Sequence, residues 1–314
     1  MAVEIEKLIS AHPEDDNGPA KEKKLGFILS YPVEQAASTS GSAIKWKSFA
    51  VNDAVKFAYL NFNLLLVAEV NQALEKNGVN IRVYALVDDT IGNLARGRYY
   101  DRETMVVVTV GMGTNAAYVE SPQAVPKWEG PSPKAGEMVI SKEWGNFSSF
   151  HLPITEYDAS LDAGSSNPGP RIFEKLTSKM YLGEIVRRVL LKIAQETALF
   201  GDIVPPKLRV PFQLRYQRLY RSNCNPSITD STAMAREVVV EVCHIIAERG
   251  ARMVGAGIVA LLEDGLYEQY RVFINYLHST VWEMLGNELS ENVIVEHSHG
   301  GSGAGALFLA ASES

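Results

Sequence analysis

The chain contains few cysteines and no concentration of basic residues. Cys224 and Cys243 are its only two cysteines, and they have neither the spacing of a metal site nor the number needed for a disulfide framework. This usage is typical of a reducing compartment. The formal net charge is −7 and the lysines and arginines form no block, so the sequence has no electrostatic footprint for nucleic acid. Nucleic acid is therefore not expected as a partner.

Long apolar runs are also absent. The most apolar stretch, residues 57–70, is too short to span a bilayer and is interrupted by Asn61, Asn63 and Glu69. Residues 1–24 carry many acids and lack the apolar region of a signal peptide. We therefore expect no membrane segment and no anchor, and we expect a cytosolic location.

The most informative part of the sequence is a pair of apolar strands with polar or glycine-rich ends. Residues 83–87 predict a strand that ends at Asp88 and Asp89, and residues 105–110 predict a strand that runs into a glycine turn, 111–115. Ligands of open α/β sheets lie at the carboxyl ends of strands. An acid at one end and a glycine turn at another favour phosphoryl transfer, because amides bind phosphate and the acid accepts a proton from the attacking hydroxyl. Acids at strand ends are common in α/β proteins, where they often cap a turn or a helix instead of binding a ligand. For Asp88, capping and ligand contact are both kept as alternatives.

The other patterns predict an α/β protein of one large or two medium domains. Apolar runs predict strands over 25–32, 43–49, 81–87, 105–110, 116–120, 138–141 and 292–296. Helical spacing predicts helices over 54–77, 172–200, 237–262, 266–286 and 304–311. Thr90 is expected to cap a short helix, and residues 145–170 are expected to be mostly loop. Arg187 and Arg188 are expected on a solvated helix face.

Several segments, in this order, resemble the hexokinase family and most closely its plant members. They include LGFILSYPVEQ from Leu25, ALVDDTIG from Ala85, GMGTNAAYVE from Gly111, GEMVISKEWGNF from Gly136, the long run from His151 to Leu191, and EHSHGGSGAG from Glu296. The resemblance extends from residue 25 to about residue 312. It implies an α/β, actin-like ATPase (ribonuclease H-like) fold with two lobes, of which the small lobe is incomplete. The expected parts are an N-terminal helix and acidic linker (1–24), a partial small lobe (25–87), a large lobe (88–297) and a C-terminal glycine loop and helix (298–314).

The resemblance implies transfer of the γ-phosphoryl group of Mg-ATP to the C6 hydroxyl of a hexose, with glucose as the expected substrate, at the first step of glycolysis. ATP and Mg²⁺ are the implied cofactors, and Asp89 matches the catalytic base. The family's sugar contacts match Ser30, Lys47, Asp88, Asn115, Glu143 and Glu174. Its phosphate and nucleotide contacts match Gly111, Gly113, Thr114, Gly301, Ser302 and Gly303. No metal site made of protein side chains is expected, because His297 and His299 lack a third ligand nearby.

The sequence departs from the family at several places. The family's Asp-Leu-Gly-Gly-Thr-Asn phosphate hairpin has no counterpart in residues 1–24. Met112 stands where the phosphate turn has threonine, and Asp88 stands where a sugar-binding asparagine is usual. The strand around Lys47 is one residue shorter than in the family, and a slip of one residue reverses side-chain faces. Residues 260–265 join two elements that the family separates by a longer piece.

Two classes of function therefore remain open. The first is an ATP-dependent hexose kinase with impaired activity. The second is a non-catalytic, hexokinase-like protein that binds glucose as a sensor or scaffold and has protein partners. The retained Asp89, Glu143 and Glu174 favour a sugar site in both classes. The missing hairpin and Met112 count against efficient transfer, because positioning and electrostatics supply nearly all of the catalysis in this chemistry.

Overall fold

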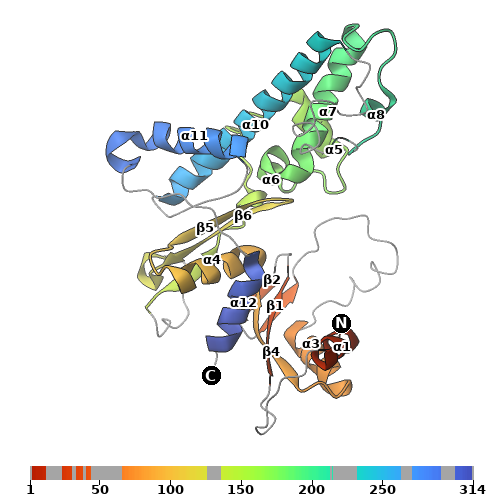
Figure 1. The fold of residues 1–314 in the computed structure, drawn as a ribbon. Helices are drawn as coiled ribbons and strands as arrows, with labels where there is room; N and C mark the ends of the chain where they lie inside the picture. Colours follow the sequence, from red (N-terminus) through yellow and green to blue (C-terminus); the bar gives the residue numbers. More distant parts are fainter. Residues whose placement is uncertain are drawn as a thin grey trace. The chain divides into compact units, whose positions relative to one another are not determined.

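The computed structural model describes residues 2–11, 23–29, 33–37, 40–43, 66–125, 136–212, 214, 232–262, 271–290 and 301–312 (Figure 1). The chain divides into two compact units. The first contains Met1–Met105 together with Ser298–Ser314, and the second contains Val106–His297. The two ends of the chain therefore belong to one unit.

The first unit is built around a pair of parallel strands. Its helices are α1 (Ala2–Ala11), α3 (Leu66–Lys76), α4 (Asp89–Tyr100) and α12 (Gly301–Ser312), and its strands are β1 (Lys23–Ile28), β2 (Val33–Ala37), β3 (Ser40–Ala43) and β4 (Ile81–Val87). β1 pairs in parallel with β4, and β2 pairs antiparallel with β3. Just beyond β1, the Leu29 amide donates to the Val87 carbonyl at 2.9 Å. The carboxyl ends of β1 and β4 therefore lie at one edge, where β4 leads directly into α4.

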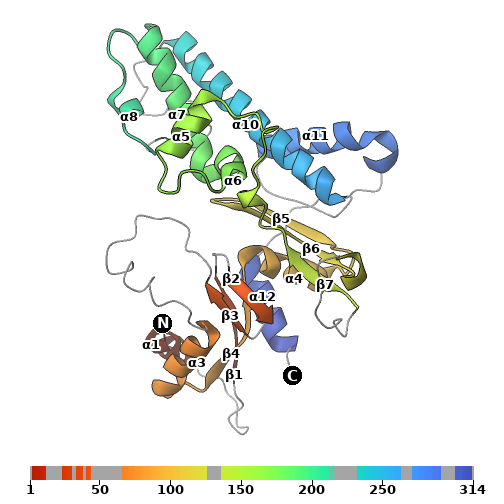
Figure 2. The same ribbon diagram turned by 180° about the vertical axis from the view of Figure 1, so that it is seen from behind.

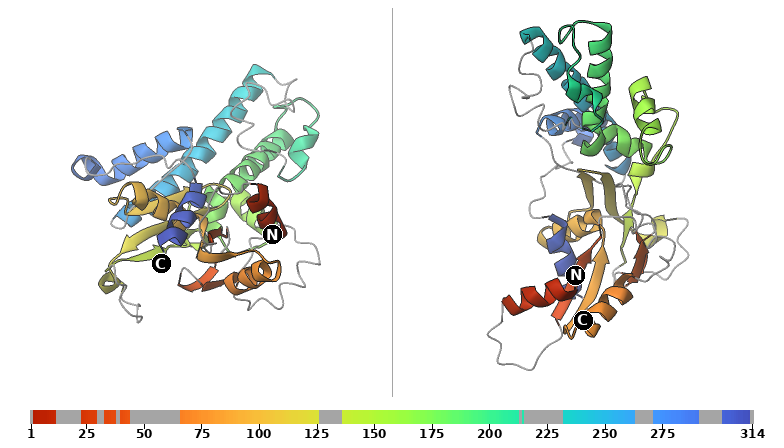
Figure 3. Two further views of the ribbon diagram at one scale, coloured as in Figure 1. Left: turned by 60° about the horizontal axis from the view of Figure 1, so that its bottom comes forward. Right: turned by 90° about the vertical axis from the view of Figure 1, so that its right-hand side faces the viewer.

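The C-terminal helix α12 packs against α4 and β1, two elements that are far from α12 in the sequence (Figures 1 and 3). Glycines make this approach possible. A Cβ atom added at Gly305 would lie 1.6 Å from the Gly92 carbonyl oxygen, and one added at Gly26 would lie 2.3 Å from the Ala306 carbonyl oxygen. Only residues without a side chain allow backbones to come this close. The position of α12 is consequently fixed by backbone contact.

Two small apolar clusters lie among the described residues of the first unit. One cluster consists of Leu29, Val67, Val83 and Leu86. A second cluster joins Leu74 of α3 to Val79, with α1 contributing Ile5 at its edge. β4 supplies Val83 and Leu86, and α3 supplies Val67 and Leu74. Buried positions of β4 fall on both faces of the strand, because successive side chains point to opposite sides.

The second unit combines an antiparallel sheet with a larger group of helices (Figure 2). Its strands are β5 (Val106–Val110), β6 (Thr114–Glu120) and β7 (Met138–Ser141), paired in the order β5-β6-β7. Its helices are η1 (Pro122–Ala124), η2 (Trp144–Asn146), α5 (Glu156–Ala163), α6 (Ile172–Thr177), α7 (Lys179–Glu196), α8 (Pro206–Arg209), α10 (Ala233–Leu262) and α11 (Arg271–Ser290). In the β5-β6 hairpin Val110 is opposite Thr114, so Gly111, Met112 and Gly113 form the turn between the strands.

Two apolar clusters lie among the described residues of the second unit. One is formed mainly by α5, α7 and α10 and contains Leu161, Ile185, Leu190 and Ile246. The other joins the sheet to α6, α10 and α11 and includes Trp144, Phe173, Val254 and Ile258 among its members. The second cluster lies directly beneath the polar residues of the candidate site described below.

Several predicted elements are confirmed. The strands predicted over 81–87 and 138–141 have these exact bounds, and the strand predicted over 105–110 is β5. The predicted α/β class is also confirmed. The predicted strand over 43–49 lies outside the described residues apart from Ala43, which ends β3. The predicted strand over 292–296 and the first part of the helix over 54–77 also lie outside them. The lobe boundary expected at residue 88 falls between β4 and α4, which belong to one compact unit here, and the assignment of lobes stays a prediction.

Three local predictions are wrong, and one helix was not predicted. The helix predicted over 172–200 is two helices, because Ser178 has an extended conformation and the Lys179 amide donates to Gly111 instead of continuing α6. The segment 145–170 is mostly loop, as predicted, but it also contains the unpredicted helix α5. Asp88, not Thr90, caps α4. Arg187, expected on a solvated face, is buried against Glu184.

Candidate functional site

The candidate base Asp89 lies where β4 meets α4 in the first unit. Asp88 ends the strand in an extended conformation, and its Oδ1 accepts hydrogen bonds from the Thr90 and Ile91 amides, both at 2.7 Å. These bonds satisfy two amides of the first helical turn that have no partner within the helix. Asp89 is then the first residue of α4 and is half-buried. The cap fixes the direction in which the helix, and with it Asp89, leaves the sheet.

Asp89 receives a hydrogen bond from the other end of the chain. The Ser302 hydroxyl donates to Asp89 Oδ1 at 2.9 Å. Gly301, Ser302 and Gly303, the predicted nucleotide residues at the C-terminus, form the first turn of α12, and Gly301 has a left-handed φ of 71°. The structure therefore brings the predicted base and the predicted C-terminal nucleotide loop together within one unit.

The glycine turn between β5 and β6 lies in the second unit. The Gly111 amide donates to the Gly113 carbonyl at 2.8 Å, and the Gly111 carbonyl accepts from the Lys179 amide at 2.9 Å. The turn is therefore held both internally and by the start of α7. Met112 at its tip is 58% exposed. The Gly111 amide points into the turn, so it does not face a ligand in this conformation.

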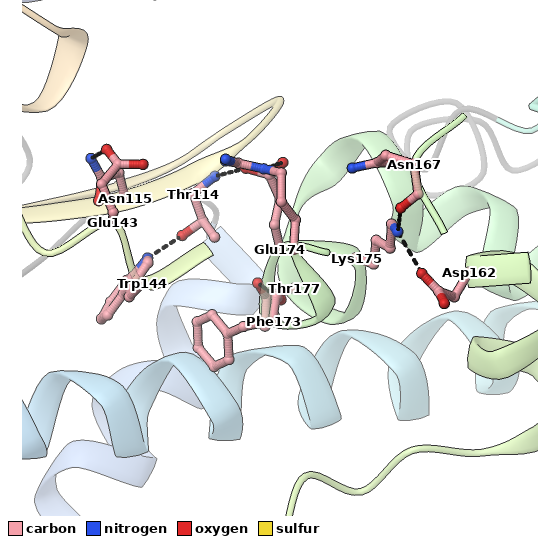
Figure 4. A network of polar contacts seen from close by, with 11 residues as sticks. Thr114, Asn115, Glu143, Trp144, Asp162, Asn167, Phe173, Glu174, Lys175 and Thr177 are labelled. Carbon is pink, nitrogen blue, oxygen red and sulfur yellow. Dashed lines mark hydrogen bonds and ion pairs between the residues drawn. The ribbon is translucent and has the colours of Figure 1, made fainter. Parts of the chain in front are cut away.

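Asn115 and Glu143, two predicted sugar contacts, lie side by side (Figure 4). Asn115 Nδ2 donates to Glu143 Oε1 at 2.8 Å and to the Ser141 hydroxyl at 3.0 Å. Asn115 belongs to β6, and Glu143 lies two positions after the end of β7. Glu143 has a left-handed φ of 48°, which is unusual for a residue with a side chain and recurs at functional sites. An amide beside a carboxylate offers both donors and acceptors to a polar ligand.

Glu174, the third predicted sugar contact of this unit, is buried and ion-paired (Figure 4). Arg171 donates to both of its oxygens at 2.7 Å, and the Thr114 amide donates to Oε2 at 3.0 Å. The hydrogen bonds with Glu174 raise the pKa of the Arg171 guanidinium. The Thr114 hydroxyl in turn accepts a hydrogen bond from the Trp144 indole at 2.8 Å. Thr114, expected to contact nucleotide, thus directs both its amide and its hydroxyl toward protein groups.

Arg171 and Trp144 hold this network together and were not singled out from the sequence. Arg171 precedes Glu174 by three residues, a spacing at which opposite charges meet on a helix, so this pair had a detectable signal. The bond from Trp144 to Thr114 had none, because it joins residues thirty positions apart. Beside Glu143 and Trp144, the second unit has a largely apolar pocket of about 730 Å³, which Phe147 and Phe173 also line.

The predicted site residues fall in both units. Asp88, Asp89 and the α12 residues belong to the first unit, whereas the glycine turn, Asn115, Glu143 and Glu174 belong to the second. Ser30 and Lys47 lie outside the described residues. Each unit thus carries its own cluster of candidate residues.

Other kinds of site find no support in the described part of the chain. No group of three or more His, Cys, Asp or Glu side chains there is placed to hold a metal ion. Burial raises the pKa of the Cys243 thiol to about 12, so this cysteine is not an activated nucleophile. None of the described helices is long and apolar enough to cross a membrane. The cytosolic location expected from the sequence stays a prediction.

Comparison with known sequences gives matches along the whole chain. Two sequence models described as hexokinase match residues 1–99 and 105–312. The match thus begins at residue 1, earlier than the expected start at residue 25. Hexokinase-1 of Nicotiana tabacum is 43% identical over 351 aligned positions, covering 100% of this chain and 69% of the relative. Hexokinase-2 of Arabidopsis thaliana is 44% identical, covering 99% of this chain and 68% of the relative. The tobacco alignment is longer than the chain, so the relative carries residues without a counterpart here.

Solved structures agree with the sequence comparison. The hexokinase from Schistosoma mansoni complexed with glucose superimposes with a TM-score of 0.81 at 27% identity, covering 99% of this chain and 74% of that one. A second hexokinase crystal structure has a TM-score of 0.74 at 23% identity and supports the fold alone. The actin-like ATPase fold expected from the sequence is thereby confirmed. The extent and identity of these matches show that the chain belongs to the hexokinase family of sugar-phosphorylating enzymes.

Proposed function

We propose that this chain transfers the γ-phosphoryl group of ATP to the C6 hydroxyl of glucose. The observation that carries the proposal is the placement of Asp89. Its carboxylate lies at the carboxyl end of β4, in the first turn of α4, and is held by a hydroxyl from the first turn of α12. Helix N-termini favour negative charge and bind phosphate, so this is a suitable place for a transferring phosphoryl group.

The proposed reaction follows from this geometry. Asp89 accepts the proton of the C6 hydroxyl as the sugar oxygen forms its bond to the γ-phosphorus. The bond between the γ-phosphorus and the bridging oxygen breaks, and ADP leaves with the bonding electrons. Gly301 and Gly303 have open space where side chains would stand, so phosphate oxygens can approach the backbone there.

Asn115 and Glu143 support a sugar as the acceptor, and Glu174 is proposed as a further sugar contact. A sugar hydroxyl both donates and accepts hydrogen bonds, and the amide of Asn115 beside the carboxylate of Glu143 offers both partners. The hexokinase from Schistosoma mansoni, solved with glucose, supports glucose as the substrate of this chain too. Ser30, Lys47 and Asp88 are proposed as further sugar contacts.

ATP is proposed to enter as its magnesium complex. Mg²⁺ commonly binds through substrate phosphates and water with only one or two carboxylates. The described residues fit this mode at the start of α12, where Gly301 and Gly303 leave open space for the phosphate oxygens that would carry the ion. The ion would neutralise charge on the phosphates, while the chain's own part is to orient the sugar and accept its proton.

We further propose that turnover is low, for reasons located in the glycine turn. Met112 places a large exposed side chain at its tip, and the Gly111 amide is used inside the turn. Both features reduce what the turn offers to phosphate. The same observation favours the second candidate function, a hexokinase-like protein that binds glucose without phosphorylating it and acts through protein partners. In that case the Asn115–Glu143 pair would still bind the sugar.

The decisive test is glucose-6-phosphate formation from glucose and Mg-ATP. We compare the unchanged chain with Asp89→Ala and with a matched control, Asp202→Ala, which removes an exposed carboxylate of the second unit. Loss of the base should lower kcat by about 100-fold or more and leave glucose affinity nearly unchanged, because general-base contributions are of this order. The control should behave like the unchanged chain.

Two other outcomes would change the assignment. Equal turnover in the unchanged chain and in Asp89→Ala would refute Asp89 as the base. No turnover from folded protein that still binds glucose in calorimetry would favour the non-catalytic candidate. Absence of both turnover and glucose binding would overturn both functions.

A further inference from the structure

We propose that Ser302 is a positioning residue that orients the Asp89 carboxylate for proton transfer. The inference rests on the proposed function, in which Asp89 is the base. The Ser302 hydroxyl donates to Asp89 Oδ1 at 2.9 Å, across 213 positions of sequence, and both residues are half-buried. A hydrogen bond between such distant residues restrains the carboxylate only if the two helices that carry them are themselves fixed.

The packing of α12 on α4 supplies that restraint. A Cβ atom at Gly92 would lie 2.7 Å from the Ser302 carbonyl oxygen, and one at Gly305 would lie 1.6 Å from the Gly92 carbonyl oxygen. One turn of α4 is therefore in backbone contact with two successive turns of α12. The backbone of Ser302 cannot move away from α4 without separating these contacts, and interiors packed this closely resist such shifts.

The bond also decides which carboxylate oxygen receives the proton. Ser302 occupies Oδ1, and among the described residues no donor is bonded to Oδ2. Oδ2 is therefore the oxygen open to the sugar hydroxyl. Fixing the rotation of the carboxylate keeps Oδ2 directed at one place, and orientation of reacting groups is a large part of catalysis in this chemistry.

This role differs from the nucleotide contact expected for Ser302 from the sequence. A serine hydroxyl has one proton to donate. Because that proton is donated to Asp89, the hydroxyl cannot also donate to a phosphate oxygen in this conformation. The nucleotide contact would fall to the backbone of the glycines on either side, Gly301 and Gly303.

The test compares Ser302→Ala with Ser312→Ala, a control on the same helix whose hydroxyl is exposed and donates to the Leu309 carbonyl. Ser302→Ala should lower kcat about tenfold or more, the effect expected for losing one hydrogen bond to a charged group. KM for glucose and KM for Mg-ATP should change little. In the Asp89→Ala background, Ser302→Ala should have no further effect on the residual rate. Ser312→Ala should match the unchanged chain throughout.

Three results would overturn the inference. A raised KM for Mg-ATP with kcat retained would make Ser302 a nucleotide contact. The same loss of kcat in both backgrounds would make its role merely structural. Strictly additive losses of Tm in Ser302→Ala, Asp89→Ala and the double variant would refute the contact itself, because bonded pairs are non-additive. The thermal cycle needs no activity, so an inactive chain with a coupled pair would overturn the proposed function without refuting the contact.

Discussion

Asp88 shows how one carboxylate can serve the fold at a position where a sugar contact is also expected. Its Oδ1 accepts from two amides of α4, so its capping role is observed. A carboxylate accepts hydrogen bonds but donates none, whereas an asparagine amide does both. Asparagine and aspartate are about equally good helix caps. The cap and the sugar contact can therefore be separated by substitution at this one position.

We predict that Asp88→Asn tightens glucose binding without destabilising the chain. The oxygen of the new amide retains the cap, and its NH₂ group adds a donor for a sugar hydroxyl. The matched variant Asp88→Ala removes the cap and should lower the free energy of unfolding by about 1 kcal/mol. Calorimetric titration with glucose and thermal unfolding measure the two effects.

Unchanged or weaker affinity in Asp88→Asn, with Tm retained, would contradict a sugar contact at this position. A fall in Tm equal to that of Asp88→Ala would instead show that asparagine does not keep the cap. The two readouts thus test the sugar contact and the capping role separately.

Arg187 illustrates what a sequence cannot show about single residues. The spacing from Glu184 to Arg187 permits an ion pair on a helix, and a solvated face is the simplest expectation for such a pair. In the structure both are buried, Arg187 donates to the Leu208 carbonyl, and the Phe212 amide donates to Glu184. The cover comes from a segment more than twenty residues away. Burial that depends on distant chain segments leaves no local pattern, whereas the helical spacing of the pair was readable.

At the scale of elements, α5 was predictable and was not predicted. Thr155 and Asp158 form a capping box at the start of the helix. The Thr155 amide and the Thr155 hydroxyl both donate to Asp158 Oδ2. The pattern of threonine followed three residues later by an acid is visible in the sequence. It was obscured by the glycine and proline residues further along the loop. The separation of α6 from α7 had no such signal, because it depends on the bond from Lys179 to Gly111.

The capping box also makes a prediction about pH. Burial acts to raise the pKa of Asp158, but hydrogen bonds from Arg249 and Thr155 outweigh it and leave the pKa below its usual value. A carboxyl with a lowered pKa in the folded state contributes stability above its unfolded pKa of about 4, and loses that contribution as pH falls through the folded value. Asp158→Asn should therefore be less stable than the unchanged chain at pH 6, by about 2 kcal/mol.

This difference should shrink as pH falls below about 4, because Asp158 is then protonated first in the unfolded chain and, at still lower pH, in the folded chain. Urea unfolding at pH 6 and at successively lower pH measures it, with Asp202→Asn as the exposed control that should show no difference at any pH. A stability difference that is the same at pH 6 and pH 3 would contradict the assignment of the charged pair with Arg249.

At the scale of the whole molecule, the chain is divided in a way that its sequence order does not suggest. The first unit takes its strands from the N-terminal third and one helix, α12, from the last residues. The sequence predicted α12 as a helix but not its partners, because helical spacing says nothing about which distant glycines it meets. The candidate site residues were proposed from the family resemblance, and their roles stay predictions. The structure adds how Asp89, Asn115 and Glu174 are held.

Among the described residues, the apolar clusters of the first unit are smaller than those of the second, and this has a consequence for unfolding. The first unit has small apolar clusters around Leu86 and Leu74, whereas the second has two larger clusters along α7 and α10. Buried apolar area supplies most of the free energy that opposes unfolding. Chains with more than one compact unit often depart from two-state behaviour. The first unit is therefore expected to unfold at the lower denaturant concentration.

We predict that α12 loses its protection from hydrogen exchange together with β4 and α4, although α11 precedes it directly among the described helices. Amide exchange measured by mass spectrometry in rising urea should show peptides from 81–100 and 301–312 opening together, before peptides from α7 and α10. The reason is the backbone contact of Gly305 with Gly92, which lets neither helix open without the other. Opening of α12 together with α11, or of every segment at a single urea concentration, would contradict this division. Either result would mean that the packing of α12 on α4 contributes little to holding the two ends of the chain together.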